Sequence, residues 1–501
     1  MYEKRSIFRC FMARPSGCAL LPHLKYRSLF ILVLFTPIFI SPFALALQAR
    51  PITLQETIDI ALKQNLDLKL ADLEKERGEA YLYDATSRFD LTLKSNMDWT
   101  HDQDKPASSI SGTLNQTANL NAGLEKKFIF GTKFELNFKN YYKHTDSSFA
   151  AKPNYWDPKL ELVATHPILE NSFGINDQKV LRSGKKRKTA QMHKYRAQAE
   201  KVIAEITKLY WRFAFKKQLV DIQKKAYEDA QNLFRANQKK IKLGTIEKTD
   251  LLASHANMLS RKNELLLANN DYKVVLEEFL RTLQVKEPTF PKEDVPFDPE
   301  TFDFKTSTAF ALKHQKAFQE AKENLDAKTL DFNVAKNEKL PTFNFVGSVS
   351  GNGLSETYHT ALSEAMSFDY PTYVVGAVFA MPLGNDAAQS KAIQTRIEKT
   401  NAEIQFQKLQ DEIQTKLKTQ IETLDTLKEH VQASQAITQL LQKKMIEEEK
   451  KFNQGRSSIN FVIQFQEDTL NSQKALLQSK LSYTEALIDL KRTRGDFFEA
   501  R

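Results

Sequence analysis

Hydrophobic residues recur at steps of three and four over two long segments of the chain. One segment follows Pro167 and the other follows Pro382, and they run for 120 and 119 residues without another proline. The recurring positions are Val202, Ile206, Leu209, Phe213, Leu219, Ile222, Ala226 and Leu233 in the first segment, and Ile413, Leu417, Leu424, Leu427 and Val431 in the second. This pattern predicts two helical hairpins with coiled-coil-like packing, turning at Gly244 and Gly455. A helix from about Asp177 to Leu243 would be roughly 100 Å long.

In the segment before each helical hairpin, hydrophobic and polar residues alternate with a period of two. Leu91, Leu93, Met97 and Trp99 alternate with polar residues, and residues 342–349 show the same alternation. Residues 159–166 and 373–381 are the predicted returning strands. Alternation over roughly nine to eleven residues is typical of membrane-spanning barrel strands, although a half-buried strand of an ordinary sheet fits it equally well. Because four strands cannot close a barrel in lipid, strands that span would have to belong to a barrel shared by several chains.

The two patterns occur twice in the same order, which predicts an internal duplication. A helical segment opens each half, at Ala61-Leu62-Lys63 and at Ala311-Leu312-Lys313, and a capping-box pattern over residues 53–56 starts the first. We expect a first repeat over residues 47–284, with a β region at 90–166, and a second over residues 307–501, with a β region at 341–382. Closely spaced prolines mark residues 285–306 as the linker.

The N-terminal segment reads as an export signal. A mostly apolar run over residues 29–47 follows a positively charged stretch and ends on the small residues Ala44 and Ala46. This pattern predicts a signal peptide over residues 1–46, cleaved after Ala46. A retained membrane anchor is the alternative, but Pro37 and Pro42 inside the run favour cleavage. Translation from Met12 is compatible with the same interpretation.

Composition narrows the possible functions further. Both cysteines, Cys10 and Cys18, precede the predicted cleavage site, so the mature chain would have no thiol for disulfides, metal sites or nucleophilic catalysis. The same segment holds half of the formal net charge of +10, which weakens a nucleic-acid interpretation. The basic run over residues 182–188 is expected to be a solvated or headgroup-facing patch. The sequence contains no phosphate loop or nucleophile elbow, and its scattered histidines do not favour a metal site, so no enzyme, cofactor or metal is expected.

Several short motifs lie at corresponding places in the two halves. They are Ile52-Thr53-Leu54-Gln55-Glu56 with Ala61-Leu62-Lys63-Gln64-Asn65 at the start, His166-Pro167-Ile168-Leu169 and Met381-Pro382-Leu383-Gly384 at the strand-to-helix returns, and Leu243-Gly244-Thr245, Asp250-Leu251-Leu252-Ala253 and Asn453-Gln454-Gly455-Arg456-Ser457-Ser458 at the hairpin tips. Each motif alone is weakly specific. Their order, spacing and duplication resemble the TolC family of outer-membrane efflux proteins over essentially the whole mature chain.

The resemblance implies a mainly α-helical protein with membrane β-strands that forms a homotrimer in the outer membrane of a Gram-negative cell. Four strands per chain would build a shared twelve-stranded β-barrel, continuous with an α-barrel of long hairpins in the periplasm. A periplasmic adaptor would meet the hairpin tips, namely Leu243, Gly244, Thr245, Gln454, Gly455, Arg456 and Ser457. An inner-membrane transporter of the RND or ABC type would supply the energy, and substrate would pass by passive conduction. Small-molecule efflux is the first expectation for the cargo, and type I protein secretion is the second.

Two features depart from the family pattern. The first β region is longer than the second and contains a further hairpin, from Leu114 to Phe128 and from Phe134 to Tyr142, which we interpret as an extracellular extension, with additional barrel strands as the alternative. Some family members carry acidic residues six and nine positions after the second tip glycine, where this chain has Phe461 and Gln464. After the first tip glycine the sixth position is Asp250, which could form a cation-favouring ring or simply pair with a lysine. Phe461 points to an apolar constriction that gates by dewetting.

Two other classes of protein compete with an exit duct. A periplasmic or surface coiled-coil scaffold would explain the helices, but it needs neither the alternating strands nor the Pro-marked returns. A DNA-associated coiled coil is incompatible with an export signal. An outer-membrane duct accounts for all of these features together.

Overall fold

A computed structural model describes residues 50–105, 112–244 and 246–497. The predicted signal peptide and its cleavage residues, Ala44 and Ala46, lie outside the described residues. The described part belongs to one compact unit, Gln48–Arg501. Its helices are α1 (Leu54–Gln64), α2 (Leu66–Ser87), α3 (Ile175–Lys242), α4 (Lys248–Leu283), α5 (Phe304–His314), α6 (Lys316–Asn337), α7 (Tyr358–Ser367), α8 (Asp386–Asn453) and α9 (Ile459–Arg494). Its strands are β1 (Arg50–Ile52), β2 (Thr92–Asp102), β3 (Asn115–Lys127), β4 (Lys133–Thr145), β5 (Asn154–Pro167), β6 (Thr289–Pro291), β7 (Thr342–Asn352) and β8 (Pro371–Ala380).

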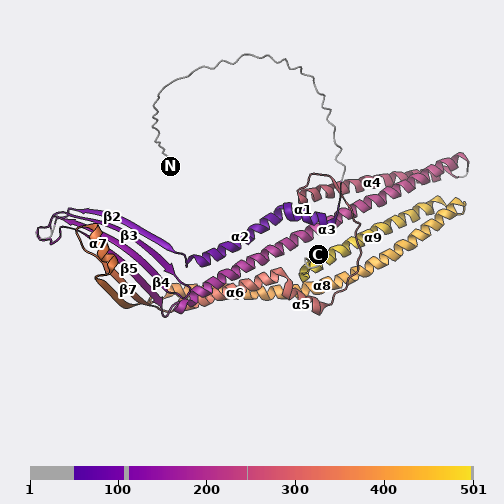
Figure 1. Cartoon of the computed structure of the whole chain (residues 1–501). Helices are drawn as coiled ribbons and strands as arrows, with labels where there is room; N and C mark the ends of the chain where they lie inside the picture. The colour runs from indigo at the N-terminus through magenta and orange to yellow at the C-terminus, as the bar shows by residue number, and fades with distance from the viewer. Residues whose placement is uncertain (1–49, 106–111, 245, 498–501) are drawn as a thin grey trace, which may run out of the picture. The chain divides into compact units, whose positions relative to one another are not determined.

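The two predicted helical hairpins are present (Figure 1). Helix α3 packs against α4, and α8 packs against α9, while α3 also contacts α9 and so joins the two pairs. Nearer the sheet, α2 lies beside α3, α3 beside α6, and α6 beside α8. Helix α3 has 68 residues, so it is about 100 Å long at 1.5 Å per residue, as the sequence predicted.

Corresponding elements of the two halves match in length. Helices α3 and α8 have 68 residues each, and α4 and α9 have 36 each. Helices α1 and α5 have 11 residues, and α2 and α6 have 22. Two hydrophobic clusters follow this division only in part. One is centred on α3 with α1 and α4 and also includes Leu477, Leu481 and Ile488 of α9, and the other joins α8 to α5, α6 and α9.

Side-chain caps explain where the short helices begin and end. Thr53 and Glu56 form the predicted capping box at the start of α1. Asn65 then breaks the chain between α1 and α2, because it has an extended backbone and its side chain accepts hydrogen bonds from the Asp67 and Leu68 N–H groups. Gln315 does the same between α5 and α6, where it accepts from the Phe318 N–H.

A six-stranded antiparallel sheet has the order β2-β3-β4-β5-β7-β8 (Figure 1). Strands β2, β5, β7 and β8 are the four that the sequence predicted. The expectation of only four strands is wrong, because β3 and β4 lie inside the sheet, between β2 and β5. The interpretation of this hairpin as an extracellular extension is therefore also wrong. Every residue of β2 pairs with β3, so β2 and β5 do not meet.

The proline-rich linker is tied to the middle of the helical region. Its strand β6 pairs in parallel with β1, and α5 begins at Phe304, three residues before the predicted start of the second repeat. The buried Tyr210 hydroxyl donates to the Ile52 carbonyl at 3.1 Å and to the Glu293 carboxylate at 2.5 Å. The buried Tyr483 hydroxyl donates to the Asp298 carbonyl at 3.1 Å. Burial raises the pKa of both phenols, which keeps them protonated as donors.

Within the described residues, none of the helices combines the length and the apolar character needed to cross a bilayer.

Candidate transport path and docking surfaces

The six-stranded sheet has one apolar face. Residues that pair across the strands point to the same side of a sheet, so the register assigns every side chain to a face. Several large hydrophobic side chains on this face are highly exposed; Met97 is 79% exposed and Val375 is 75% exposed. The apolar face comprises Leu93, Met97, Trp99, Leu120, Leu124, Phe134, Leu136, Phe138, Leu160, Leu162, Phe343, Phe345, Val349, Tyr373, Val375 and Phe379. An exposed apolar surface of this size marks a membrane or protein contact.

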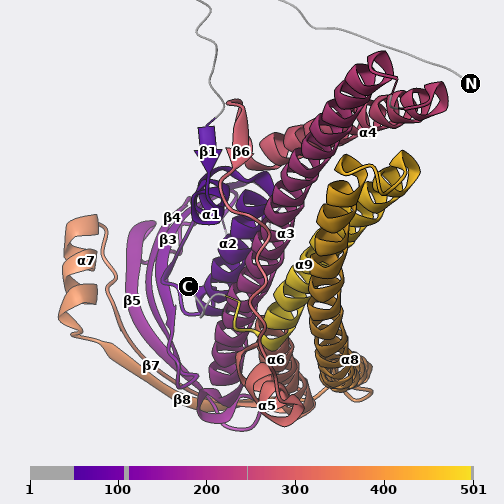
Figure 2. The ribbon, with the colours of Figure 1, turned by 90° about the vertical axis from the view of Figure 1, so that its right-hand side faces the viewer.

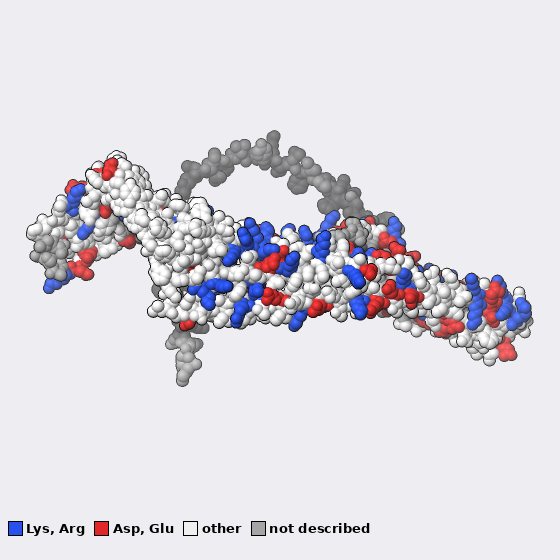
Figure 3. Space-filling view, turned by 90° about the horizontal axis from the view of Figure 1, so that it is seen from below, with Lys and Arg blue, Asp and Glu red and all other residues white. Residues whose placement is uncertain are grey.

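The opposite face of the sheet is polar. Lys139 pairs with Glu161 at 2.8 Å across β4 and β5, and Lys94 pairs with Glu125 across β2 and β3. The Asn119 amide donates to the Asp98 carboxylate at 2.6 Å. Figure 3 shows a band without charged residues over the sheet, between charges at its far end and those on the helices. Strands of 10 to 14 residues with one apolar and one polar face have the dimensions of membrane-spanning barrel strands.

Helix α7 was not expected from the sequence, and it covers the end of the apolar face farthest from the long helices. It contacts β5 and β7, and Figure 2 shows it on the side of the sheet away from α2. Ala361 and Ala365 are fully buried against the sheet, and the Tyr358 ring meets the Trp156 ring at 5.1 Å. The signal in the sequence was short, an alanine pair four residues apart after Thr357.

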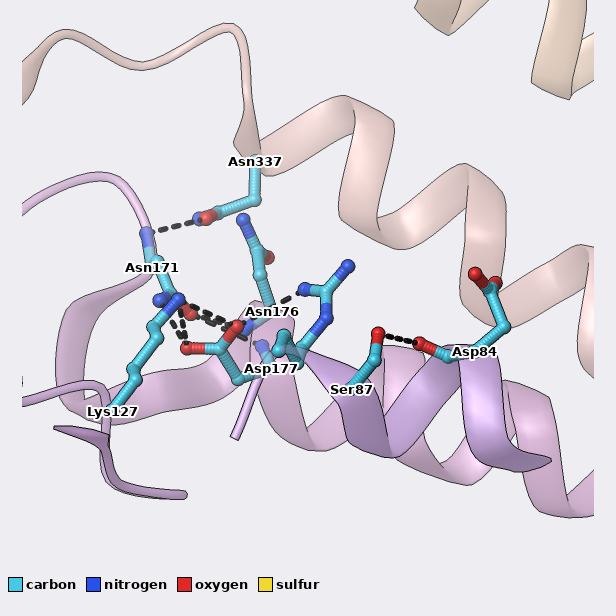
Figure 4. Close-up of polar contacts among 8 residues, drawn as sticks. Asp84, Ser87, Lys127, Asn171, Asn176, Asp177 and Asn337 are labelled. Carbon is cyan, nitrogen blue, oxygen red and sulfur yellow. Dashed lines mark hydrogen bonds and ion pairs between the residues drawn. The ribbon is translucent and has the colours of Figure 1, made fainter. Parts of the chain in front are cut away.

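Asp177 organises the junction between sheet and helices (Figure 4). It lies in the first turn of α3 and is 1% exposed. Its carboxylate pairs with Arg88 at the end of α2 at 3.1 Å and with Lys127 at the end of β3 at 2.8 Å. The Asn171 side-chain amide nitrogen also donates to it, at 2.6 Å, while the Asn171 side-chain oxygen, Oδ1, accepts from the Asn176 and Asp177 N–H groups. One buried carboxylate therefore ties together a helix end, a strand end and a strand-to-helix turn.

The predicted strand-to-helix returns lie at this level. Pro167 is the last residue of β5 and is paired with Asn344 of β7. Pro382 follows the end of β8 and precedes Asn385, which starts α8 with a left-handed backbone at φ 48°. Leu383, next to Pro382, is fully exposed in the single chain.

The predicted adaptor-docking residues lie at the turns of the two hairpins. Leu243 and Gly244 follow α3, and Gln454, Gly455, Arg456 and Ser457 separate α8 from α9, whereas Thr245 lies outside the described residues. Gly244 and Gly455 have φ of +70° and +72°, which explains the glycines, because other residues are strained there. Leu243 is 76% exposed. The Lys240 ammonium lies 4.2 Å from the Phe452 ring, so the ends of the two hairpins touch.

Two of the three predicted aperture residues, Asp250 and Phe461, lie in the first turns of α4 and α9, and Gln464 lies in the second turn of α9. The Asp250 carboxylate accepts a hydrogen bond from the Glu247 N–H at 3.4 Å, so it caps α4. Phe461 is 54% exposed and stacks on Phe465 at 6.3 Å. Gln464 is exposed. The single chain therefore places all three near the hairpin tips.

A buried arginine links the two hairpins and was not anticipated from the sequence. Arg261 of α4 has a side chain only 5% exposed, and it pairs with Glu264 at 2.9 Å and with Glu467 of α9 at 3.2 Å. Lys474 of α9 pairs with Glu264 at 3.1 Å. Burial opposes ionisation of Glu264, but the hydrogen bond from Lys474 and the two positive charges lower its pKa overall. No local pattern in the sequence distinguishes Arg261 from the many exposed basic residues.

The basic run on α3 is largely an ion-pair ladder rather than a free patch. Lys186 pairs with Asp326 and Arg187 with Asp331 on α6, at 2.9 and 2.5 Å. Lys188 pairs with Glu79 on α2 at 2.7 Å. The remaining members, Arg182 and Lys185, line a groove beside α6. These ion pairs link α3 to its neighbours α6 and α2.

Both flanks of the chain carry exposed hydrophobic stripes. One flank consists of β2, α2 and α4, and the other of β8 and α8, because these are the outermost elements in the order of packing. On the first flank the stripe residues of α2 and α4 are Leu66, Leu70, Leu73, Leu252, Leu259, Leu266, Leu267 and Val274. On the second they are Ile393, Ile397, Ile404, Ile437, Leu440 and Ile446. Hydrophobic residues spaced seven apart, or three and four apart, are typical of helices that pack against further helices.

Solved structures with the same fold are outer-membrane channels. The CmeC outer membrane channel of Campylobacter jejuni is 18% identical, with a TM-score of 0.62 over 89% of this chain and 86% of that chain. The outer membrane protein VceC of Vibrio cholerae is 11% identical, with a TM-score of 0.62 over 88% and 96%. The MtrE outer membrane channel of Neisseria gonorrhoeae is 14% identical, with a TM-score of 0.55 over 88% of each chain. No protein-family model and no curated protein matches the sequence.

The fold is therefore that of the TolC-type outer-membrane channels, with long helical hairpins attached to a two-faced antiparallel sheet. The chain differs from the expected pattern in its six-stranded sheet.

Proposed function

We propose that this protein is the outer-membrane exit duct of a tripartite export system. The observation that carries the proposal is the two-faced sheet, whose apolar face would meet lipid and whose polar face would line water. The chain would reach the outer membrane after export by its signal peptide and cleavage after Ala46. A scaffold without channel activity, the alternative, gives no reason for an exposed apolar face on strands of bilayer-spanning length.

The duct would be a ring of identical chains. An open sheet edge cannot persist in lipid, so β2 of one chain must pair with β8 of the next. The two hydrophobic flanks are different surfaces, and a contact between different surfaces closes into a ring when the rotation allows it. The resemblance to the TolC family supports three chains. The matched lengths of corresponding elements support an origin by internal duplication.

The helical hairpins would form the periplasmic part, and their tips would contact an adaptor. Exposed Leu243 and the residues around Gly455 offer that surface. An RND or ABC transporter in the inner membrane would supply energy, so the duct itself would conduct passively and need no catalytic residue or cofactor. Small molecules remain the preferred cargo, and a secreted polypeptide is the second choice.

The narrowest point would lie at the tips. Three copies of Asp250 would favour cations, and three copies of Phe461 would form an apolar constriction, with Gln464 one helical turn further on. Asp250→Asn keeps an oxygen that can cap α4 but removes the charge, so it isolates the electrostatic role. We expect it to reduce cation over anion selectivity without lowering the amount of assembled protein.

The proposal is tested by planar-bilayer recording of the detergent-purified full chain. We expect discrete conductance steps, with reversal potentials in a salt gradient that change in Asp250→Asn. The contradicting result is protein that is extracted from the outer membrane but shows no conductance at any voltage, also when the adaptor is added. This result would favour the scaffold without channel activity.

A further inference from the structure

The hairpin β3–β4 crosses the sheet at full length. Thirteen residues of β3 pair with thirteen of β4, and β4 then pairs with β5 from Lys133 to His144. The hairpin is not an appendage at the end of β2, because it lies along the whole of β2 and along β5 from Asn154 to Thr165.

Both faces of the sheet continue through the hairpin. Leu120 and Leu136 lie on the apolar face in register with Met97 and Leu162, respectively. On the polar face, Lys139 of the hairpin pairs with Glu161 of β5, and Asn119 bonds to Asp98 of β2. A hairpin that sat in water beyond the membrane would have no need of a continuous apolar face.

The turn of the hairpin is fixed at the junction with the helices. Gly131 and Gly174 lie so close that a Cβ on Gly174 would be 2.1 Å from the Ile129 carbonyl oxygen. Lys127, at the end of β3, reaches Asp177 in α3 at 2.8 Å. The turn therefore lies level with the ends of β2 and β5, and the hairpin covers the same height as the other strands.

From these contacts we infer that each chain contributes six strands, and that three chains close an eighteen-stranded barrel. The number three rests on the proposed function, whereas the six strands rest on the pairing register. Barrel diameter grows roughly linearly with strand number, and barrels of about 16–18 strands enclose an open aqueous channel. The membrane section would thus be wider than a twelve-stranded barrel and would not limit cargo size, which leaves selection to the hairpin tips and their partners.

Disulfide trapping in outer membranes tests the strand count, with the full chain carrying serine at positions 10 and 18. Met97→Cys with Leu120→Cys joins directly opposed positions of β2 and β3, and Leu136→Cys with Leu162→Cys joins β4 and β5. Opposed residues on neighbouring strands are close enough for a disulfide. The matched control is Met97→Cys with Leu160→Cys, which would cross-link only if β2 lay beside β5.

We expect both hairpin pairs to oxidise to near completion within single chains, and the control pair to remain reduced. The mass of the same cross-linked protein in detergent then gives the number of chains. Six strands in a trimer support the eighteen-stranded barrel. Cross-linking of the control pair in a trimer overturns it and leaves the duct intact. A particle that is not a trimer overturns the proposed assembly and the count of eighteen with it, whatever the cross-links show.

Discussion

At the scale of single residues, burial changes the pKa of a polar side chain in the helical region. Glu200 of α3 is 5% exposed and borders a cleft of about 360 Å³ that is also lined by Lys316 and Arg492. Burial raises the pKa of its carboxyl from 4.5 to about 7, although Lys316, Arg196 and Arg492 act in the opposite direction. The folded protein therefore holds this proton more tightly than the unfolded chain does.

The pKa shift of Glu200 predicts a pH-dependent stability. Between about pH 4.5 and 7 the unfolded chain releases a proton that the folded protein retains, so stability falls as pH rises and levels off above about 7. The free energy of unfolding changes by at most about 3.5 kcal/mol over this range, at about 1.4 kcal/mol per pH unit. We expect Glu200→Gln to melt at a higher temperature than the natural protein at pH 8 and at a similar one at pH 4. Thermal melts followed by circular dichroism in detergent measure this, with the exposed Glu205→Gln as control. Equal differences at both pH values would contradict the assignment.

The ion pairs of Arg261 predict that its substitution changes how readily the proposed duct opens. Its removal leaves Glu264 and Glu467 without their shared cation, and charged hydrogen bonds of this kind contribute about 2 kcal/mol. If the two hairpins separate when the duct opens, Arg261→Met should shift the equilibrium toward the open state by on the order of tenfold. Open probability in single-channel records is the readout, and Lys262→Met on the exposed face is the matched control. An open probability of Arg261→Met equal to that of the natural protein would show that these ion pairs do not restrain opening.

The junction is the critical feature at the scale of elements, because sheet and helices meet there through a few close contacts. Gly174 has φ +74° and approaches the β3–β4 turn, whereas Gly244 has φ +70° and open space within 4 Å of where a Cβ would stand. The two glycines share their backbone conformation and differ only in their surroundings.

These two glycines give a matched pair of substitutions. Gly244→Ala should cost about 1 kcal/mol, the penalty of a left-handed backbone for alanine. Gly174→Ala adds a clash with the Ile129 carbonyl and should cost several kcal/mol, or prevent insertion of the sheet. The two variants are compared by the amount of oligomer that outer-membrane samples show on gels run without heating. Equal losses would mean that the close approach at Gly174 is not needed.

Local patterns predicted most individual elements but not their partners. Helix α3 spans Ile175–Lys242, close to the predicted limits, because apolar steps and the absence of proline are local signals. The alternation in β2 is equally compatible with β3 or β5 as neighbour, so the place of the hairpin could not be read from it. The Asn65 side chain caps α2 locally, and its amide also donates to the Thr282 carbonyl, a partner 217 residues away that no local pattern predicts. Asp177 acquires its role through Arg88 and Lys127, 89 and 50 residues away, and Arg261 through Glu467, 206 residues away.

At the scale of the whole molecule, both flanks of the single chain expose hydrophobic residues. Leu266 is 60% exposed in the stripe on α4, and Ile397 is 51% exposed in the stripe on α8. Residues exposed to this degree on repeats of seven are expected to be covered by a neighbouring chain.

A charge within a stripe should therefore prevent assembly. We expect Leu266→Glu to reduce the oligomer at least tenfold while leaving the helix content of the chain unchanged, since the site is exposed in the single chain. Lys262→Glu, on the same helix and also exposed, is the control for added negative charge. Gel filtration with circular dichroism separates loss of assembly from loss of folding. Normal assembly of Leu266→Glu would place the interface elsewhere.

The central claim is that several copies of this chain share one barrel in the outer membrane. The most direct test is the mass of the protein extracted from a purified outer-membrane fraction, measured by light scattering with the detergent contribution subtracted. The account predicts a trimer in that fraction. A monomer or dimer that is soluble in the periplasm would contradict it.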